Sequence, residues 1–130
     1  MTGIGGSANP RNSAIAEILR VARVPKGQSR RWYRLLEELD SWELAAVFYL
    51  VDTCNLSLAT AFDGMDDVRL QEGALEDVAR ELFDDCYLST IPESVHSYID
   101  YEQFAYDCRI GGDLREFRFD GTTYTCTSGH

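Results

Sequence analysis

The chain has 130 residues, of which 45% are hydrophobic, and it carries a formal net charge of -10. That apolar content excludes a disordered acidic tail, because burial of so much apolar surface offsets the entropy of ordering the chain. The longest apolar run, Leu44 to Val51, is far shorter than the roughly 20 residues of a membrane span, so we expect a cytoplasmic protein with one or two small folded units and no membrane contact.

Charge is divided by position along the chain. The first 34 residues hold seven Lys and Arg against one acid, and the remaining 96 residues hold twenty-one acids against five Arg. Such sign asymmetry is typical of a protein with a charged partner. The acidic body repels DNA and attracts a protein that binds DNA, since a field of this size steers association.

The N-terminal third is predicted to be helical after a flexible tail over residues 1–12, which are rich in Gly, Ser and Asn. Apolar residues at helical spacing predict a first helix from residue 13 to Val24 and a second that begins near Ser29. Ser41 is the predicted cap of a third helix, which carries Leu44 to Val51.

Six cations between Arg20 and Arg34 make residues 13–40 a basic helical segment. We interpret this segment as a solvated face, or as one that docks on an acidic surface of the protein itself or of a partner. Contact with nucleic acid is the alternative.

Residues 41–130 form the acidic body. Residues 55–73 predict a short helix with turns around it and a brief strand at Val68 to Leu70. Ala74 to Tyr87 predicts an amphipathic helix of about four turns, whose apolar face holds Leu75, Val78, Ala79, Leu82, Phe83 and Cys86.

The last third of the chain predicts two short helices and a hairpin. Pro92 opens the first of these helices, with Val95, Tyr98 and Ile99 expected on its buried side. Asp100 opens the second through a capping box, and Gly111-Gly112 ends it. The runs Leu114 to Phe119 and Thr122 to Thr127 predict strands joined by Asp120-Gly121, which favours a type I′ turn. The fold class is therefore α+β, a mostly helical small domain or domains with a C-terminal β-hairpin.

Four cysteines lie at long, unequal intervals, without a Cys-x-x-Cys pair. We expect Cys54, Cys86, Cys108 and Cys126 to be small core residues and expect no metal site and no cofactor. Ser94 near His96 lacks a nucleophile elbow, and carboxylate pairs arise by chance among twenty-two acids. We therefore expect no catalytic residue and no enzyme activity.

The polar face of the helix at Ala74 to Tyr87 is unusually acidic, with Arg80 as its only base. Like charges four residues apart, such as Asp77 with Glu81, cost a few tenths of a kcal/mol each. Asp84 and Asp85 add negative charge near the helix C-terminus, where the macrodipole disfavours it. A sequence that accepts such penalties indicates that the charge itself has a use.

The stretch from Ile91 to Asp107 resembles the C-terminal segment of the antirestriction protein ArdA family. A Pro-Glu step leads there to an aromatic-rich Tyr-x-Asp-Tyr-Glu-x-Phe-Ala-x-Asp run and a Gly-Asp turn, and the acidic helix upstream is also similar, so that the resemblance extends over Trp42 to Phe119. The matching residues are Pro92, Glu93, Tyr98, Asp100, Tyr101, Glu102, Phe104, Ala105, Asp107, Gly112 and Asp113.

The resemblance implies an elongated acidic protein that imitates bent DNA and occupies the DNA site of type I restriction and modification enzymes of the host cell, without catalysis. It also implies a possible homodimer. The chain departs from the family at its front, where we find no counterpart of the family's usual first domain and where the basic segment to Arg34 is not what a DNA mimic is expected to show.

Carboxylates in place of phosphates are the candidate partner-binding groups. The net charge of -16 over the 96 residues that follow Arg34 matches about 27 Å of duplex, since DNA offers about one charge per 1.7 Å of axis. Asp100 has a competing role as a helix cap. The predicted phosphate-mimicking acids are Asp63, Asp66, Asp67, Glu72, Glu76, Asp77, Glu81, Asp84, Asp85, Glu93, Glu102 and Asp107.

Two other functions fit the same charge pattern. The first is an anti-CRISPR protein that uses acidic mimicry to block DNA binding by a CRISPR effector. The second is a non-enzymatic acidic interaction module, in which the basic N-terminus binds nucleic acid or a partner and the acidic body prevents nonspecific adhesion.

Overall fold

The structure of the chain, a computed structural model, describes residues 10–128. These residues divide into two compact units, with a boundary after Val68. Unit 1 holds the described residues up to Val68 together with Phe119–Gly121, and unit 2 holds Arg69–Arg118 and the residues from Thr122 onward. The predicted α+β class is confirmed, since helices dominate and three strands form one small sheet with the order β1-β3-β2.

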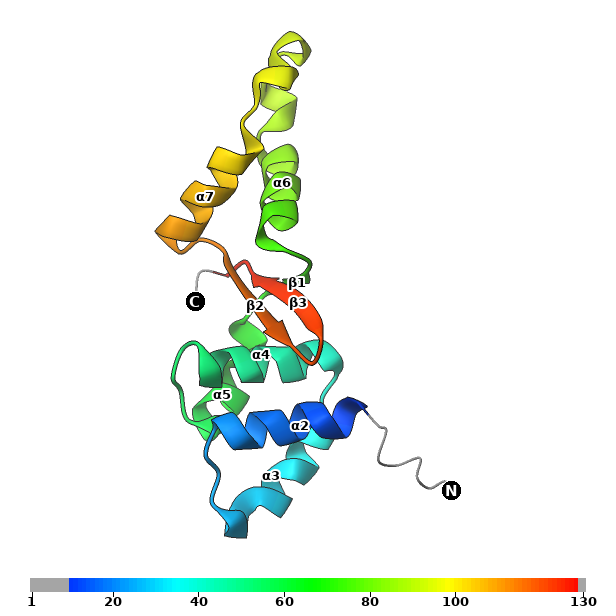
Figure 1. Ribbon diagram of the computed structural model, residues 1–130, viewed down its shortest axis with the longest axis vertical. Coiled ribbons are helices and arrows are strands. Elements are labelled where there is room, and N and C mark those ends of the chain that lie inside the picture. Colours follow the sequence, from blue (N-terminus) through cyan, green and yellow to red (C-terminus); the bar gives the residue numbers. More distant parts are fainter. Residues whose placement is uncertain (1–9, 129–130) are drawn as a thin grey trace. The chain divides into compact units, whose positions relative to one another are not determined.

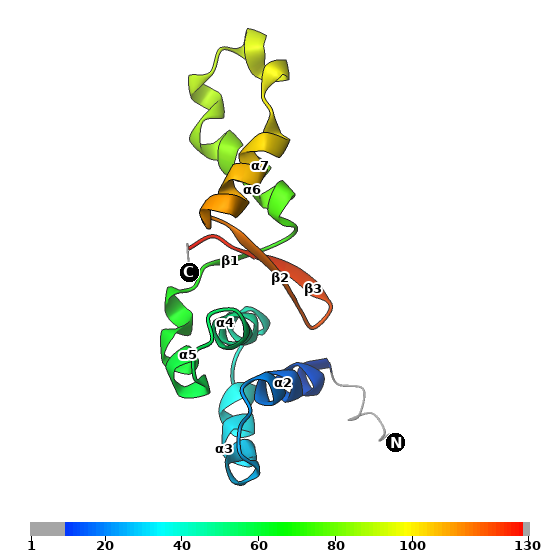
Figure 2. The same ribbon diagram turned by 60° about the vertical axis from the view of Figure 1, so that its left-hand side comes forward.

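Unit 1 is a bundle of short helices around one buried helix (Figures 1 and 2). Helix α4 is buried without interruption from Leu44 to Val51, and both α2 and α5 pack against it. A helix that is apolar on all sides is typical of the centre of a core. The helices of unit 1 are α2 (Pro10–Val21), α3 (Lys26–Glu37), α4 (Ser41–Asp52) and α5 (Leu58–Gly64), followed by the 3₁₀ turn η1 (Met65–Asp67).

The ends of these helices differ from those predicted. Helix α2 begins at Pro10, within the predicted tail, because the fixed φ of proline suits the first helical position. The first nine residues of that predicted tail lie outside the described residues. Helix α4 is capped by Asp40 and not by Ser41, and the backbone N–H of Asp40 donates to Oε1 of Glu43 at 2.9 Å.

Unit 2 combines the small sheet, apart from Phe119 at the end of β2, with a helical hairpin. Strand β1 pairs antiparallel with β3, with Leu70 opposite Cys126. Asp120 and Gly121 both have positive φ, 52° and 77°, which agrees with the predicted type I′ turn. The elements in chain order are β1 (Leu70–Glu72), α6 (Leu75–Cys86), the 3₁₀ helices η2 (Leu88–Thr90) and η3 (Glu93–Tyr98), α7 (Tyr101–Gly111), β2 (Arg115–Phe119) and β3 (Thr122–Cys126).

The core of unit 2 lies where the first half of α6 meets the second half of α7. Its buried side chains are Leu75, Val78 and Ala79 of α6, Ala105 and Cys108 of α7, and Leu114. Gly112, with φ of 78°, ends α7 as predicted, because this left-handed conformation suits glycine.

Several apolar side chains predicted to be buried are exposed. Val95 and Tyr98 are 40% and 82% exposed, because the segment between α6 and α7 lies at the end of the hairpin away from the sheet (Figures 1 and 2) and has no further layer to cover it. The 3₁₀ period of three residues places Val95 and Tyr98 on the same side of η3. Leu82, at 37%, and Cys86 are exposed as well, since the buried core of unit 2 ends one turn earlier on α6.

Burial along α6 predicts a sharp difference between two leucines. Leu75→Ala removes a side chain that is 1% exposed and should lower the free energy of unfolding by about 2 to 5 kcal/mol. Leu82→Ala, on the same helix but 37% exposed, is the matched control and should cost about 1 kcal/mol or less. Urea denaturation followed by circular dichroism measures both, and equal losses would contradict the burial of the α6 face.

The cysteines should differ in reactivity. Burial, with the charges of Asp113 and Asp107, raises the pKa of the Cys108 thiol, and since the thiolate is the nucleophile, Cys108 should react slowly. Cys86 is exposed and should be alkylated first. Peptide mass spectrometry after brief iodoacetamide treatment of the native protein would show this order. Alkylation of Cys108 as fast as Cys86 would contradict it.

Candidate functional site

The predicted acids fall into two groups, one in each unit. Asp63, Asp66 and Asp67 lie on α5 and η1 of unit 1, and the other nine lie in unit 2. All twelve side chains are exposed except that of Asp84, which is half-buried. Unit 2 holds twelve acids and five Arg in all, a net charge of -7, and is the more acidic unit.

Helix α6 arranges three of these acids in a row. Asp77, Glu81 and Asp85 follow one another at intervals of four residues, so each lies about 6 Å further along the helix axis than the last. No basic residue occupies the last turn of α6, although a cation there would stabilise the helix. We call these three residues the acidic stripe.

Among the described residues, the carboxylates of unit 2 form no ion pairs. Within the described part of the chain, no Lys, Arg or His nitrogen lies within 4.0 Å of a carboxylate oxygen of any of the twelve predicted acids. The ion pair found among the described residues joins Arg20 to Glu17, at 3.8 Å on α2 of unit 1. The negative field of unit 2 therefore remains available to a partner.

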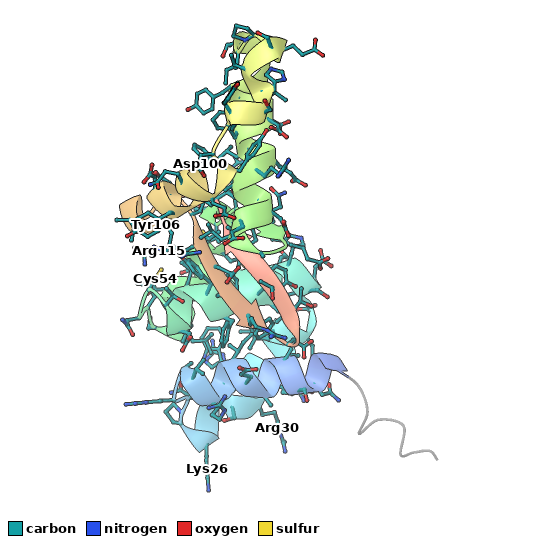
Figure 3. All side chains as sticks on the ribbon, turned by 45° about the horizontal axis from the view of Figure 1, so that its top comes forward. Lys26, Arg30, Cys54, Asp100, Tyr106 and Arg115 are labelled. Carbon is teal, nitrogen blue, oxygen red and sulfur yellow. The ribbon has the colours of Figure 1, made fainter. Side chains whose placement is uncertain are left out.

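A shallow groove of about 330 Å³ extends along α7 and adds to this acidic surface. Its polar lining includes Glu76 of α6 together with Asp100, Glu102 and Arg109. Asp100 also caps α7, since its carboxylate accepts from the backbone N–H of Gln103 at 3.0 Å. Figure 3 labels Asp100 and Tyr106, two residues of this lining. Glu76 and Glu102, far apart in sequence, are thus brought to one groove.

Aromatic rings hold the second half of α6 against the start of α7. The ring of Phe83 lies at centroid distances of 5.3, 5.5 and 5.1 Å from Tyr87, Tyr101 and Phe104. Two of these contacts are edge-to-face, a favourable geometry for aromatic pairs. We call these four rings the aromatic cluster, and it determines how the acids of α6 lie relative to those of α7.

Asp84 differs from the other acids because it is bonded within the protein. The phenol of Tyr101 donates to its Oδ1 at 2.7 Å, and the guanidinium of Arg80 lies over the Tyr101 ring at 4.2 Å. The hydrogen bond to Asp84, with smaller contributions from desolvation and the charge of Asp84, raises the pKa of Tyr101 above its usual 10.0. Asp84 therefore positions Tyr101.

Two further acids accept hydrogen bonds from glutamines. Gln71 of β1 donates through Nε2 to Glu81, and Gln103 donates to Oδ1 of Asp107 at 2.9 Å. Gln103 therefore does not complete the predicted capping box through its side chain. These bonds fix the carboxylates without removing their charge.

Sequence reasoning missed the positioning roles of Arg80, Tyr101 and Gln71. Of these three residues, only Arg80 could have been singled out from the sequence, because it is the only base on an otherwise acidic helix. Gln71 gives none, since its contact with Glu81 depends on how β1 lies beside α6. The four aromatic residues between Tyr98 and Tyr106 differ in their environments. Tyr101 and Phe104 belong to the aromatic cluster, whereas Tyr98 and Tyr106 are 82% and 53% exposed.

The remaining candidate chemistries find little support in the described residues. Residues 10–128 contain no group of three or more His, Cys, Asp or Glu side chains placed to hold a metal ion. Nε2 of His96 lies 2.8 Å from the backbone oxygen of Ile91. Among the helices described, none has the length and apolarity needed to cross a bilayer.

Comparison with known protein families places the chain in a family. The family model described as Antirestriction protein (ArdA) matches residues 27–120, which include the acidic stripe, the aromatic cluster and the groove along α7. No curated protein and no solved structure matches the chain.

The bond between Tyr101 and Asp84 predicts a specific titration. Absorbance of the phenolate should show a tyrosine that ionises above pH 10.0 and is missing in Tyr101→Phe. Because the folded-state pKa is raised, the stabilisation from this bond is complete below pH 10.0 and is lost as the pH rises through the raised value. Asp84→Asn should move the step back toward its ordinary position. A Tyr101 step that is unchanged in Asp84→Asn would exclude the carboxylate as its cause.

Proposed function

Because the chain belongs to the antirestriction protein (ArdA) family, we propose that it inhibits a type I restriction-modification enzyme by occupying the enzyme's DNA-binding site. The observation that carries this proposal is the set of exposed carboxylates in unit 2 that have no ion-pair partner among the described residues. An antirestriction protein acts on an enzyme whose substrate is DNA. An acidic surface is complementary to the basic groove in which such an enzyme holds DNA.

The proposed mechanism is substitution of carboxylates for phosphates. A basic groove holds DNA through its phosphates, and a carboxylate accepts from Arg in the same bidentate manner as a phosphate. The acidic stripe supplies three such groups over about 12 Å of helix. Glu76 and Glu102 add two more in the groove along α7. No bond is made or broken, so inhibition is reversible and competitive with DNA.

The net charge of unit 2 indicates how much of a DNA site one protomer can occupy. Unit 2, at -7, matches the charge of about 12 Å of duplex. One unit therefore covers a short part of a DNA footprint. Pairing of two copies would lengthen the decoy, and the exposed Val95 and Tyr98 of η3 are the residues that we propose for that contact.

Neutralising the acids of α6 should abolish most of the inhibition. The combined change Glu76→Gln, Asp77→Asn, Glu81→Gln and Asp85→Asn keeps side-chain size and removes four charges from exposed positions. We expect the concentration that halves cleavage of unmodified DNA by a type I enzyme to rise by at least about tenfold, since each lost charge pair in a partly desolvated groove costs about 1 kcal/mol.

A matched control removes four charges outside the proposed surface. Glu37→Gln, Glu38→Gln, Asp52→Asn and Asp120→Asn change the net charge equally at exposed positions of unit 1. This variant should inhibit like the wild type. Equal loss in both variants would show that net charge alone matters and would contradict a defined decoy surface. Undiminished inhibition by the α6 variant would contradict mimicry by unit 2. If the wild-type protein inhibited a CRISPR effector and not the type I enzyme, the proposed target would be wrong and the CRISPR effector would replace it.

A further inference from the structure

The basic side of unit 1 takes no part in the proposed decoy. Five exposed cations lie on α3 and in the turn before it: Arg23, Lys26, Arg30, Arg31 and Arg34. We call them the basic ridge. In Figure 3 the side chains of Lys26 and Arg30 extend outward from α3.

The ridge has the geometry of a regular row. Lys26, Arg30 and Arg34 follow one another at intervals of four residues, and the three cations span about 12 Å of helix axis. The opposite side of α3 faces its own unit, with Leu36 fully buried and Trp32 packed on Phe62 at a ring distance of 5.8 Å. The row is therefore held on a packed helix and points to solvent.

The cations of the ridge form no ion pair within the described residues, although Glu37 lines the same groove as Arg30 and Arg34. Among residues 12–128, none of its five cations lies within 4.0 Å of a carboxylate oxygen. Arg30 and Arg34 also border two adjacent surface grooves of about 470 and 450 Å³, one shared with Tyr33 and the other with Arg31. Both guanidinium groups are thus reachable from two sides. A row of unpaired cations beside open grooves fits an anionic ligand of extended form.

The composition of the ridge favours phosphate over other anions. Four of its five cations are arginines, whose planar fork binds phosphate oxygens in pairs. One DNA strand presents about four phosphates over 12 Å of duplex axis, at 3.4 Å each, which suits a regular row better than irregular carboxylates. The neighbouring aromatic rings are unsuited to stacking on unpaired bases, since Trp32 packs on Phe62 and the hydroxyl of Tyr33 donates to Asn12.

We propose that the basic ridge binds the phosphate backbone of duplex DNA without regard to sequence. The acidic charge of the chain opposes this contact, so binding is weak and strongly dependent on salt. The contact keeps the inhibitor beside the DNA that its target enzyme approaches. The ridge and the decoy surface then serve separate partners, DNA for unit 1 and a DNA-binding protein for unit 2.

Fluorescence anisotropy with a labelled duplex of about 20 base pairs tests the proposal on the full chain. With about four phosphate contacts, the slope of log K against log salt should be about -3.6, which is a loss of about a hundredfold between 50 and 200 mM salt. The variant Arg30→Gln, Arg31→Gln, Arg34→Gln should reduce the steepness of that slope by about 3 and weaken binding at 50 mM by at least about tenfold.

The matched control carries the same loss of charge elsewhere. Arg69→Gln, Arg115→Gln and Arg118→Gln replace three exposed arginines of unit 2, and this variant should bind the duplex like the wild type. Absence of duplex binding by the wild type at 50 mM salt would overturn the proposal, and so would equal losses in the two variants. Analytical ultracentrifugation at the same salt concentration tests the alternative that the ridge binds an acidic protein surface, such as that of a second copy. Self-association that is lost in the ridge variant, together with absence of duplex binding, would overturn the proposal in favour of that alternative.

Truncation is unsuitable for this test, because residues before Arg34 include Ile15 and Ile18, which are fully buried in unit 1. The point variants leave that core intact. The result is also independent of the proposed decoy function, since loss of DNA binding and loss of restriction inhibition are measured on different variants.

Discussion

The packing of α6 against α7 opposes the repulsion among the acids of α6, and the candidate site depends on it. Asp77, Glu81 and Asp85 repel one another along one helix, and each such pair costs a few tenths of a kcal/mol. Burial of Leu75, Val78 and Ala79 against Ala105 and Cys108 offsets that cost, since a fully buried aliphatic side chain contributes about 1.5 to 3 kcal/mol. The helix can therefore remain folded while its outer face stays predominantly negative, with Arg80 as its one base.

The same pairing also fixes where the charges lie. Phe83 contacts three rings that come from both sides of the hairpin, and Tyr101 donates to Asp84 across the two helices. A decoy needs its charges held in place before binding, because ordering side chains at the interface costs affinity. The aromatic cluster, to which the motif contributes Tyr101 and Phe104, supplies contacts that hold the two helices in this arrangement.

Patterns local in sequence predicted most of the fold. The apolar spacing on α6, the Asp120-Gly121 turn and the stop at Gly112 each depend on a few neighbouring residues, and the structure shows all three. What failed depends on long-range contacts. The backbone N–H of Leu75, at the start of α6, donates to a carboxylate oxygen of Glu116 on β2 at 2.8 Å, and no local pattern predicts a bond across 41 positions. The prediction that Val95 and Tyr98 of η3 are buried was wrong for a similar reason. Spacing shows which side chains share a face of a helix but not whether another element covers that face.

In the candidate site, too, features that depend on neighbouring residues could be predicted and features that depend on long-range contacts could not. That Glu76, Asp77, Glu81 and Asp85 of α6 are exposed could be predicted from their spacing, since the opposite face is apolar. Their internal bonds could not, because Gln71 and Tyr101 reach Glu81 and Asp84 only through the fold.

The central claim is that this protein and DNA compete for one site, and direct competition tests it best. A labelled duplex bound to a type I restriction-modification complex is titrated with the wild-type protein at two salt concentrations, and a type II endonuclease serves as the control. We predict that the duplex is released from the type I complex alone and that release becomes weaker at the higher salt concentration. A ternary complex that retains the duplex, or equal release from both enzymes, would contradict a decoy that occupies the DNA site.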